Sequence, residues 1–242
     1  MQPSNFTPVC IEYQQKIRDY FNWNIEDDEY VLTWLNKNIS NFHPIWSLEN
    51  RNKNLHDISV KLGLMSNDKF VVIGANITEN ETLELSDNDA LIIADGAVGS
   101  IIELNEKLIK NIICIVSDGD GLPYISNKKI ENIPIILHAH GHAKNNLNHI
   151  LNIWSMWENP PKIIISHQIS NDIEGAINFG GFSDGDRAVC MLHAYGIKKE
   201  NITLKGFDVK NVGRWSGLTN SKIKQEKLKW MQEILEVLGH DI

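Results

Sequence analysis

The sequence predicts a doubly wound α/β fold, in which helices cover both faces of a mostly parallel β-sheet. Short runs of Val and Ile without polar alternation recur after residue 67, which is typical of strands buried on both faces. Stretches with helical periodicity separate several of these runs, at lengths that suit β-α-β connections. The chain has 242 residues, of which 42% are hydrophobic, so it can bury one large core.

The first part of the chain has a different pattern from the rest. Apolar residues between Ile11 and Leu35 recur three or four positions apart, and strand signals are weak before residue 69. We therefore expect a small N-terminal helical region over 1–68, followed by an α/β domain over 69–242.

Six apolar runs are expected to form the sheet. They cover residues 70–73, 90–93, 112–116, 133–137, 163–165 and 202–204. Helices are expected at 98–110, 143–157, 184–195 and 221–238, and the last of these has an amphipathic pattern.

Composition narrows the possible partners and location. The chain has 23 Lys and Arg against 31 Asp and Glu, and the net charge of -8 argues against a nucleic-acid surface. Three distant cysteines, Cys10, Cys114 and Cys190, suit neither a disulfide framework nor a CxxC metal site, so a cytoplasmic location is expected. No apolar stretch has the length of a membrane span, and no membrane partner is expected.

Acids or histidines follow most of the six predicted strands. Ligands of open α/β sheets bind beyond the carboxyl ends of the strands, so these residues are candidates for a site. In the DGDG motif at 118–121, Asp118 and Asp120 can face one hard cation, and Asp95 after the neighbouring strand would complete the set. Such a set suits Mg²⁺ together with substrate phosphates. The alternative is a turn with solvated acids.

A glycine-rich loop, NFGGFSDGDRA at 178–188, leads into a predicted helix. Backbone N–H groups at a helix start bind phosphate, and Arg187 in the first turn adds a two-pronged donor. The alternative is that Ser183 or Asp184 simply caps the helix.

The histidines His138, His140 and His142 alternate along the chain after the fourth strand. Alternation would suit zinc if the strand continued, but Gly141 argues against continuation. We therefore interpret His140 or His142 as a hydrogen-bond donor to substrate or phosphate. The sequence contains no GxxxxGK[ST], GxSxG or convincing GxGxxG motif, which lowers the rank of P-loop kinases, α/β-hydrolases and standard dinucleotide enzymes.

Taken in order, the motifs VVIGA, IIADGA, IVSDGDG, HAHGH, NFGGFSDGDRA and LKGFD resemble the archaeal 6-hydroxymethyl-7,8-dihydropterin pyrophosphokinase family, also described as MptE-like proteins. The resemblance runs from about residue 70 onward. IIADGA and SDGDG also look like the acidic motifs of thiamine pyrophosphokinases. The family commonly has a GxGPS-like turn after the first strand, where this sequence reads GANIT at 74–78.

The resemblance implies a Rossmann-like, thiamine pyrophosphokinase-like catalytic domain that uses ATP and Mg²⁺. Its reaction would move a diphosphoryl group from ATP to a reduced pterin, 6-hydroxymethyl-7,8-dihydropterin, releasing AMP, in folate- or tetrahydromethanopterin-type cofactor biosynthesis. Two alternatives stay open: a thiamine pyrophosphokinase-like enzyme with another acceptor, and a non-catalytic nucleotide-binding module. A homo-oligomer is compatible with the sequence.

The predicted site residues fall into three groups. The metal ligands are Asp95, Asp118 and Asp120. The catalytic residues are Asp120, Arg187 and His140. The substrate or nucleotide contacts are Gly74, Gly96, Asn178, Gly180, Gly181, Asp184, Asp186 and Arg214, among which Asn178 or Asp184 matches the amide and amino edge of a pterin.

Overall fold

The computed structural model describes residues 7–216 and 221–242, and of residues 221–224 it describes the backbone alone. None of the helices in these ranges combines the length and the hydrophobicity that a bilayer-spanning helix requires.

The described residues form a seven-stranded sheet in which every neighbouring pair is parallel. Its strands are β1 Phe70–Ile73, β2 Ala90–Ala94, β3 Ile112–Ser117, β4 Ile135–Ala139, β5 Ile163–His167, β6 Ala176–Ile177 and β7 Ile202–Lys205. Their order is β6-β5-β4-β3-β2-β1-β7. The predicted α/β class is confirmed. The fourth strand begins two residues later than expected, after Pro134, which has no N–H for a strand ladder.

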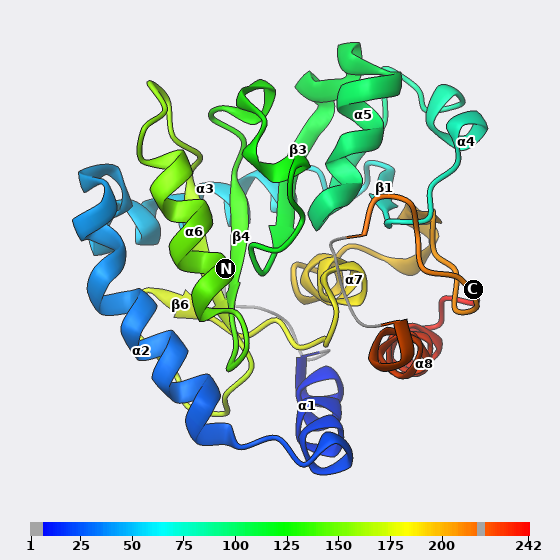
Figure 1. Ribbon diagram of the computed structural model, residues 1–242. Coiled ribbons are helices and arrows are strands. Elements are labelled where there is room, and N and C mark those ends of the chain that lie inside the picture. Colours follow the sequence, from blue (N-terminus) through cyan, green and yellow to red (C-terminus); the bar gives the residue numbers. More distant parts are fainter. Residues whose placement is uncertain (1–6, 217–220) are drawn as a thin grey trace.

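Eight α-helices surround the sheet in the described part of the chain (Figure 1). They are α1 Thr7–Phe21, α2 Ile25–Phe42, α3 Leu48–Leu64, α4 Glu79–Leu83, α5 Val98–Leu104, α6 Lys144–Trp154, α7 Asp184–Ala194 and α8 Ser221–Val237. Short 3₁₀ helices are η1 Pro44–Trp46, η2 Asp95–Ala97, η3 Glu106–Asn111, η4 Tyr124–Ser126, η5 Lys128–Ile130 and η6 Lys199–Asn201.

The helix expected over 98–110 is wrong in its second half, where α5 gives way to η3. Asn105 interrupts it, with φ -152° and ψ 56°, and its side-chain amide donates to the Thr82 carbonyl at 3.1 Å. Asn has a lower helix propensity than most residues, so a helix readily ends at such a position.

The strands contribute alternate side chains to two hydrophobic cores, one on each face of the sheet, except that the apolar residues of β7 all lie in one core. Val71 and Ile73 of β1 pack in one core with α2, α5 and α6, whereas Phe70 and Val72 pack in the other with α1, α3, α7 and α8. Helices therefore cover both faces, as a doubly wound fold requires.

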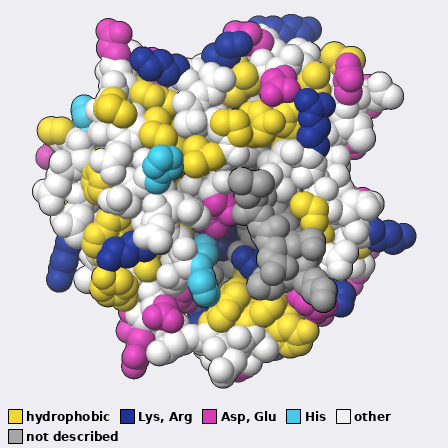
Figure 2. Space-filling view, in the orientation of Figure 1, with side chains coloured by type: hydrophobic (Ala, Val, Ile, Leu, Met, Phe, Trp, Pro, Cys, Tyr) yellow, Lys and Arg dark blue, Asp and Glu magenta, His cyan; other side chains and the backbone are white. Residues whose placement is uncertain are grey.

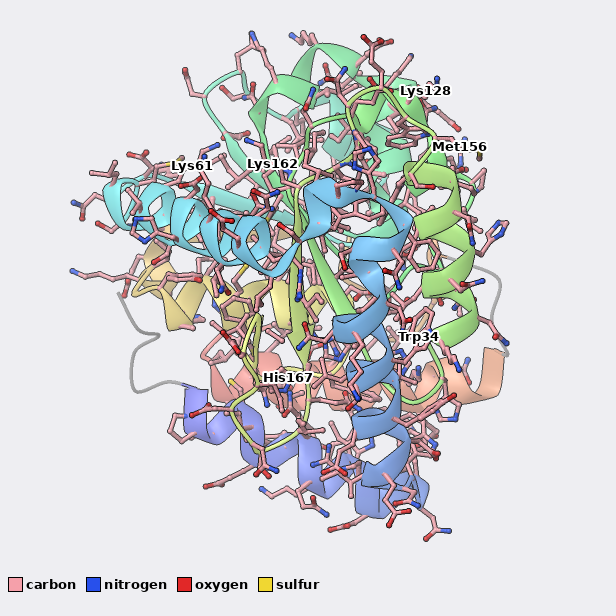
Figure 3. The ribbon with its side chains drawn as sticks, turned by 90° about the vertical axis from the view of Figure 1, so that its left-hand side faces the viewer. Trp34, Lys61, Lys128, Met156, Lys162 and His167 are labelled. Carbon is pink, nitrogen blue, oxygen red and sulfur yellow. The ribbon has the colours of Figure 1, made fainter. Side chains whose placement is uncertain are left out.

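The N-terminal helices share these cores with the strands. Trp46, which is completely buried, donates its indole N–H to the Pro161 carbonyl at 2.9 Å, just before β5. Figure 3 shows Trp34 on α2 lying toward α6, and the ammonium of Lys144 lies 5.5 Å from a ring of Trp34. The boundary at residue 68 stays a prediction.

The topology leaves a crevice at the carboxyl ends of β1 and β7. After β1 the chain turns to α4, and Leu85, two residues after the end of α4, belongs to the core with α2, α5 and α6. After β7 the chain continues to α8, which packs in the opposite core. Connections that diverge in this way from neighbouring parallel strands create the usual ligand-binding crevice of open α/β sheets.

Candidate active site

A pocket with a cavity volume of about 160 Å³ lies at this crevice. Residues that follow six of the strands line it, together with the start of α7, part of α8 and the connection between α1 and α2. Figure 2 shows a hollow in the centre of this face, with acidic, basic and histidine side chains around it. The strand ends that the sequence singled out therefore do meet in one place.

Three carboxylates come together in the pocket. Asp95 follows β2, Asp118 follows β3 and Asp184 begins α7, and one oxygen from each lies within 4.8 Å of the others. Asp95 has a φ of 47°, a backbone conformation that Asp tolerates better than most residues. The Ser117 hydroxyl donates to Asp95 Oδ1 at 2.5 Å and fixes its orientation.

Glycines allow the backbone to approach this acidic triad of Asp95, Asp118 and Asp184. A Cβ at Gly121 would lie 2.2 Å from Asp95 Oδ2, and a Cβ at Gly96 would lie 2.3 Å from the Trp215 carbonyl oxygen. A side chain at either position would clash with these atoms. The DGA and DGDG motifs therefore need glycine for close packing as well as for a tight backbone turn.

The triad concentrates negative charge in a buried place. Burial, together with the charges of neighbouring aspartates, raises the pKa values of Asp95 and Asp184 well above their usual range. Burial also acts to raise the pKa of Asp118, but the hydrogen bond from His140 and nearby positive charges outweigh it, and the pKa of Asp118 lies below its usual range. The cluster therefore combines one firmly ionised carboxylate with two that ionise with difficulty.

A divalent cation fits this arrangement. Asp118 Oδ1 is buried and has no hydrogen-bond partner among the described residues. Hard oxygen donors from clustered carboxylates are the ligands that divalent cations such as Mg²⁺ take, and a cation would offset the mutual repulsion that raises the two pKa values. Asp95, Asp118 and Asp184 could thus hold a metal ion.

Two predicted catalytic residues contact the triad. His140 Nε2 lies 3.0 Å from Asp118 Oδ2. Arg187, with 3% of its surface exposed, donates to Asp184 Oδ1 at 3.2 Å and to the Phe182 carbonyl at 2.6 Å. In this structure Arg187 holds Asp184 and the glycine-rich loop in position, and its predicted contact with phosphate stays a prediction.

Gly74, Gly96 and Asp120 line the pocket, as expected for predicted ligand contacts. Asp120 is nevertheless not part of the triad, whose third member is Asp184. The sequence analysis assigned Asp184 to the substrate, so the predicted metal set differs from the observed cluster by this exchange.

Four predicted contacts in the glycine-rich loop are not among the described residues that line the pocket: Asn178, Gly180, Gly181 and Asp186. Asp186 is fully buried and accepts from the backbone N–H of Ser183 at 2.8 Å in a capping box. Asn178 exchanges hydrogen bonds with Gln14 and accepts from the Gly180 N–H at 2.8 Å. The side chains of Asp186 and Asn178 shape the loop. The predicted substrate contacts of all four residues stay predictions.

The predicted substrate contact of Arg214 also stays a prediction. The Arg214 guanidinium pairs with Glu103 at 3.1 Å on the surface and lies over the Trp215 ring, and Arg214 is not among the described pocket-lining residues. An exposed ion pair of this kind is worth little energetically.

The sequence analysis did not assign several of the pocket-lining residues to the site, among them Trp23, Gln168 and Lys227. Gln168 directly follows β5, so the strand-end rule that found Asp95 would also have found it. Trp23 lies between α1 and α2 and Lys227 lies in α8, and neither position carries a local signal that links it to the sheet.

A buried network connects the N-terminal helices to the pocket. Asp28 of α2 accepts from the Gly141 N–H at 2.7 Å, from Gln168 Nε2 at 2.8 Å and from Arg18 Nη1 at 3.5 Å. Arg18 of α1 also donates to the Gln168 carbonyl at 2.8 Å. Asp28 thus anchors both the loop that carries His140 and the pocket residue Gln168.

The raised pKa values of Asp95 and Asp184 predict how Mg²⁺ affects stability. A carboxyl whose pKa is higher in the folded than in the unfolded state lowers stability as pH rises through the folded pKa. A bound cation removes this loss, so the increase in Tm caused by Mg²⁺ should grow with pH. Thermal unfolding with and without Mg²⁺ across a pH series measures it.

Asp95→Asn is the matched control for this prediction, because it removes one of the repelling charges. The variant should have a higher Tm than wild type at neutral pH without Mg²⁺, and a smaller increase when Mg²⁺ is added. Equal Mg²⁺ effects in both proteins at every pH would contradict a cation site at the triad.

Comparisons with known proteins agree on one family. No family model matches the chain, and no solved structure matches it. A protein of Pyrococcus furiosus is 27% identical over 238 residues, covering 95% of this chain and 92% of the relative. Proteins of Methanocaldococcus jannaschii and Methanothermobacter thermautotrophicus are 34% and 33% identical over 132 and 144 residues, covering 53% and 57% of this chain and 50% and 56% of the relatives. All three are named 6-hydroxymethyl-7,8-dihydropterin pyrophosphokinase, and the chain is similar to the first of them over nearly its whole length and to the other two over about half of it.

Proposed function

We propose that this protein transfers the diphosphoryl group of ATP to 6-hydroxymethyl-7,8-dihydropterin, giving the pterin diphosphate and AMP. The observation that carries the proposal is the triad of Asp95, Asp118 and Asp184 inside the pocket, in a chain that aligns over nearly its whole length with a relative of that name. A location in the cytoplasm and a role in folate- or tetrahydromethanopterin-type cofactor biosynthesis are part of the same proposal.

Phosphoryl chemistry depends on charge neutralisation and positioning, and the triad supports both. Mg²⁺ held by Asp95, Asp118 and Asp184 would supply the positive charge that phosphate oxygens need in the transition state. Asp120, on the wall of the same pocket, is a further proposed ligand. His140 holds Asp118 through Oδ2, which directs the unpartnered Oδ1 to the cation, and Arg187 holds Asp184.

In the proposed reaction the pterin hydroxyl attacks the β-phosphorus of ATP. The bond between that phosphorus and the oxygen that bridges to the α-phosphorus breaks, and AMP leaves. Lys227 lines the pocket and adds a positive charge there, which favours the binding of the ATP phosphate groups over their repulsion by the acids.

Release of AMP tests the proposal. Wild-type protein with ATP and Mg²⁺ is incubated with 6-hydroxymethyl-7,8-dihydropterin, with thiamine or without acceptor, each with and without EDTA. AMP that forms with the pterin alone and only in the absence of EDTA is the expected result. AMP formation with thiamine would establish the thiamine pyrophosphokinase alternative, and ATP binding without AMP formation would establish a non-catalytic module.

A further inference from the structure

One wall of the pocket is aromatic and comes from two distant parts of the chain. Trp23, in the connection between α1 and α2, and Phe182, just before α7, both line the pocket. Their ring centroids lie 6.0 Å apart with the planes tilted by 39°, and the His142 ring lies 5.2 Å from Trp23. Trp23 and Phe182 are both partly exposed, so part of each ring remains available for contact.

Phe21 supports this wall from behind. Its ring stacks on Trp23 at 4.6 Å with an interplanar angle of 15°, and on Phe182 at 6.2 Å with an angle of 25°. Phe21 is not among the described residues that line the pocket. A supported pair of rings keeps its orientation, and a rigid aromatic surface binds a planar ligand at little entropic cost.

Lys227 of α8 places a positive charge next to the aromatic wall. Its ammonium lies 5.7 Å from the ring centroids of both Trp23 and Phe182. Lys227 also lines the same pocket as Asp95, Asp118 and Asp184. A ligand on the wall would therefore have its ring on Trp23 and its reacting end toward Lys227 and the acids.

Another part of the pocket, at the ends of β1 and β7, is lined by glycine backbone as well as by side chains. Gly74 and Gly206 lie there in close contact, since a Cβ on Gly74 would be 2.6 Å from the Gly206 carbonyl oxygen. Side-chain-free backbone at the ends of β1 and β7 suits the close approach of nucleotide phosphates. The two parts of the pocket thus fit two different substrates.

We propose that Trp23 and Phe182 form the stacking surface for the pterin ring of the acceptor, so that the N-terminal helices complete the acceptor site. The inference rests on the proposed function and adds to it the place of each substrate: the pterin ring on the aromatic wall, and ATP along β1 and β7. Stacking of one heterocyclic ring on an aromatic side chain corresponds to a roughly 10-fold or larger effect on affinity.

Equilibrium binding tests the assignment without turnover. Calorimetry measures the Kd of 6-hydroxymethyl-7,8-dihydropterin in the presence of Mg²⁺ and saturating α,β-methylene-ATP, and separately the Kd of that ATP analogue. Trp23→Leu should raise the pterin Kd roughly 10-fold or more and leave the Kd of the analogue unchanged. Trp23→Phe, which keeps an aromatic ring, should restore most of the affinity, and Phe182→Leu should act like Trp23→Leu.

Trp34→Leu is the matched control. Trp34 belongs to the N-terminal helix α2 and also lies near a lysine, Lys144, but it is not among the described residues that line the pocket. This variant should leave both Kd values unchanged. A folded Trp23→Leu protein with an unchanged pterin Kd, or with weakened binding of the analogue instead, would overturn the stacking assignment. Wild-type protein that binds the pterin through Trp23 but releases no AMP would refute the proposed function alone.

Discussion

Asp118→Asn is expected to reduce the rate of AMP formation by roughly 10²- to 10³-fold or more, as removal of one essential electrostatic contact in an enzyme site does. The two carboxylate oxygens of Asp118 have different roles. Oδ2 is hydrogen-bonded to His140 Nε2, and Oδ1 is buried within the triad. An amide has one oxygen and no charge, so it can serve only one of them. The measurement is kcat as a function of Mg²⁺ concentration, which should also show a higher Mg²⁺ requirement.

Three variants sharpen this comparison. Asp184→Asn should approach the loss of Asp118→Asn, because both residues belong to the triad. Asp120→Asn should lose less, because Asp120 lines the pocket outside that cluster. Asp87→Asn, at an exposed position beside Lys107, should keep wild-type activity. If Asp120→Asn lost as much activity as Asp184→Asn, Asp120 would be a metal ligand, as the sequence predicted.

Asp28→Leu is expected to lower the free energy of unfolding by about 3–5 kcal/mol, the usual result of removing one partner from a buried ion pair. The Asp28 and Arg18 side chains are each 7% exposed, so the leucine would leave the Arg18 charge buried and unpaired. The Gly141 N–H and the Gln168 amide would also lose their acceptor. Urea unfolding followed by circular dichroism measures the change.

Glu29→Leu is the control for this prediction, because Glu29 is the next residue of α2 and is exposed. Its effect should stay below about 1 kcal/mol, as for most surface substitutions. The double variant Arg18→Met with Asp28→Leu should recover part of the lost stability, since it no longer buries a lone charge. A loss below about 1 kcal/mol in Asp28→Leu would mean that water reaches Arg18 and replaces the carboxylate.

Sequence patterns predicted most of the sheet, because parallel strands that are buried on both faces have continuous runs of apolar residues. The sequence did not predict β6, because this strand, Ala176–Ile177, is only two residues long and partly exposed. The strand order could not be predicted, since the pairing of β1 with both β2 and β7 depends on contacts between residues far apart in sequence.

The site was predictable where it lies at strand ends. Asp95 and Asp118 follow apolar runs, and the fold brings such positions together. Asp184 and Asp186 stand two residues apart in one helix start, and only the tertiary structure shows that one meets the acids while the other caps the helix. Trp23 reaches the pocket through the packing of helices that no local pattern connects to it.

The pairing of β7 with β1 affects how the protein is made on the ribosome. β1 emerges early, yet one of its edges finds its partner only when Ile202–Lys205 has been synthesised. Until then the nascent chain exposes a short, apolar, unpaired strand edge, which is the kind of surface that chaperones protect from aggregation. Because Gly74 and Gly206 contribute to one pocket, the capacity to bind ligands also arises late in synthesis, after a slow, long-range closure of the sheet.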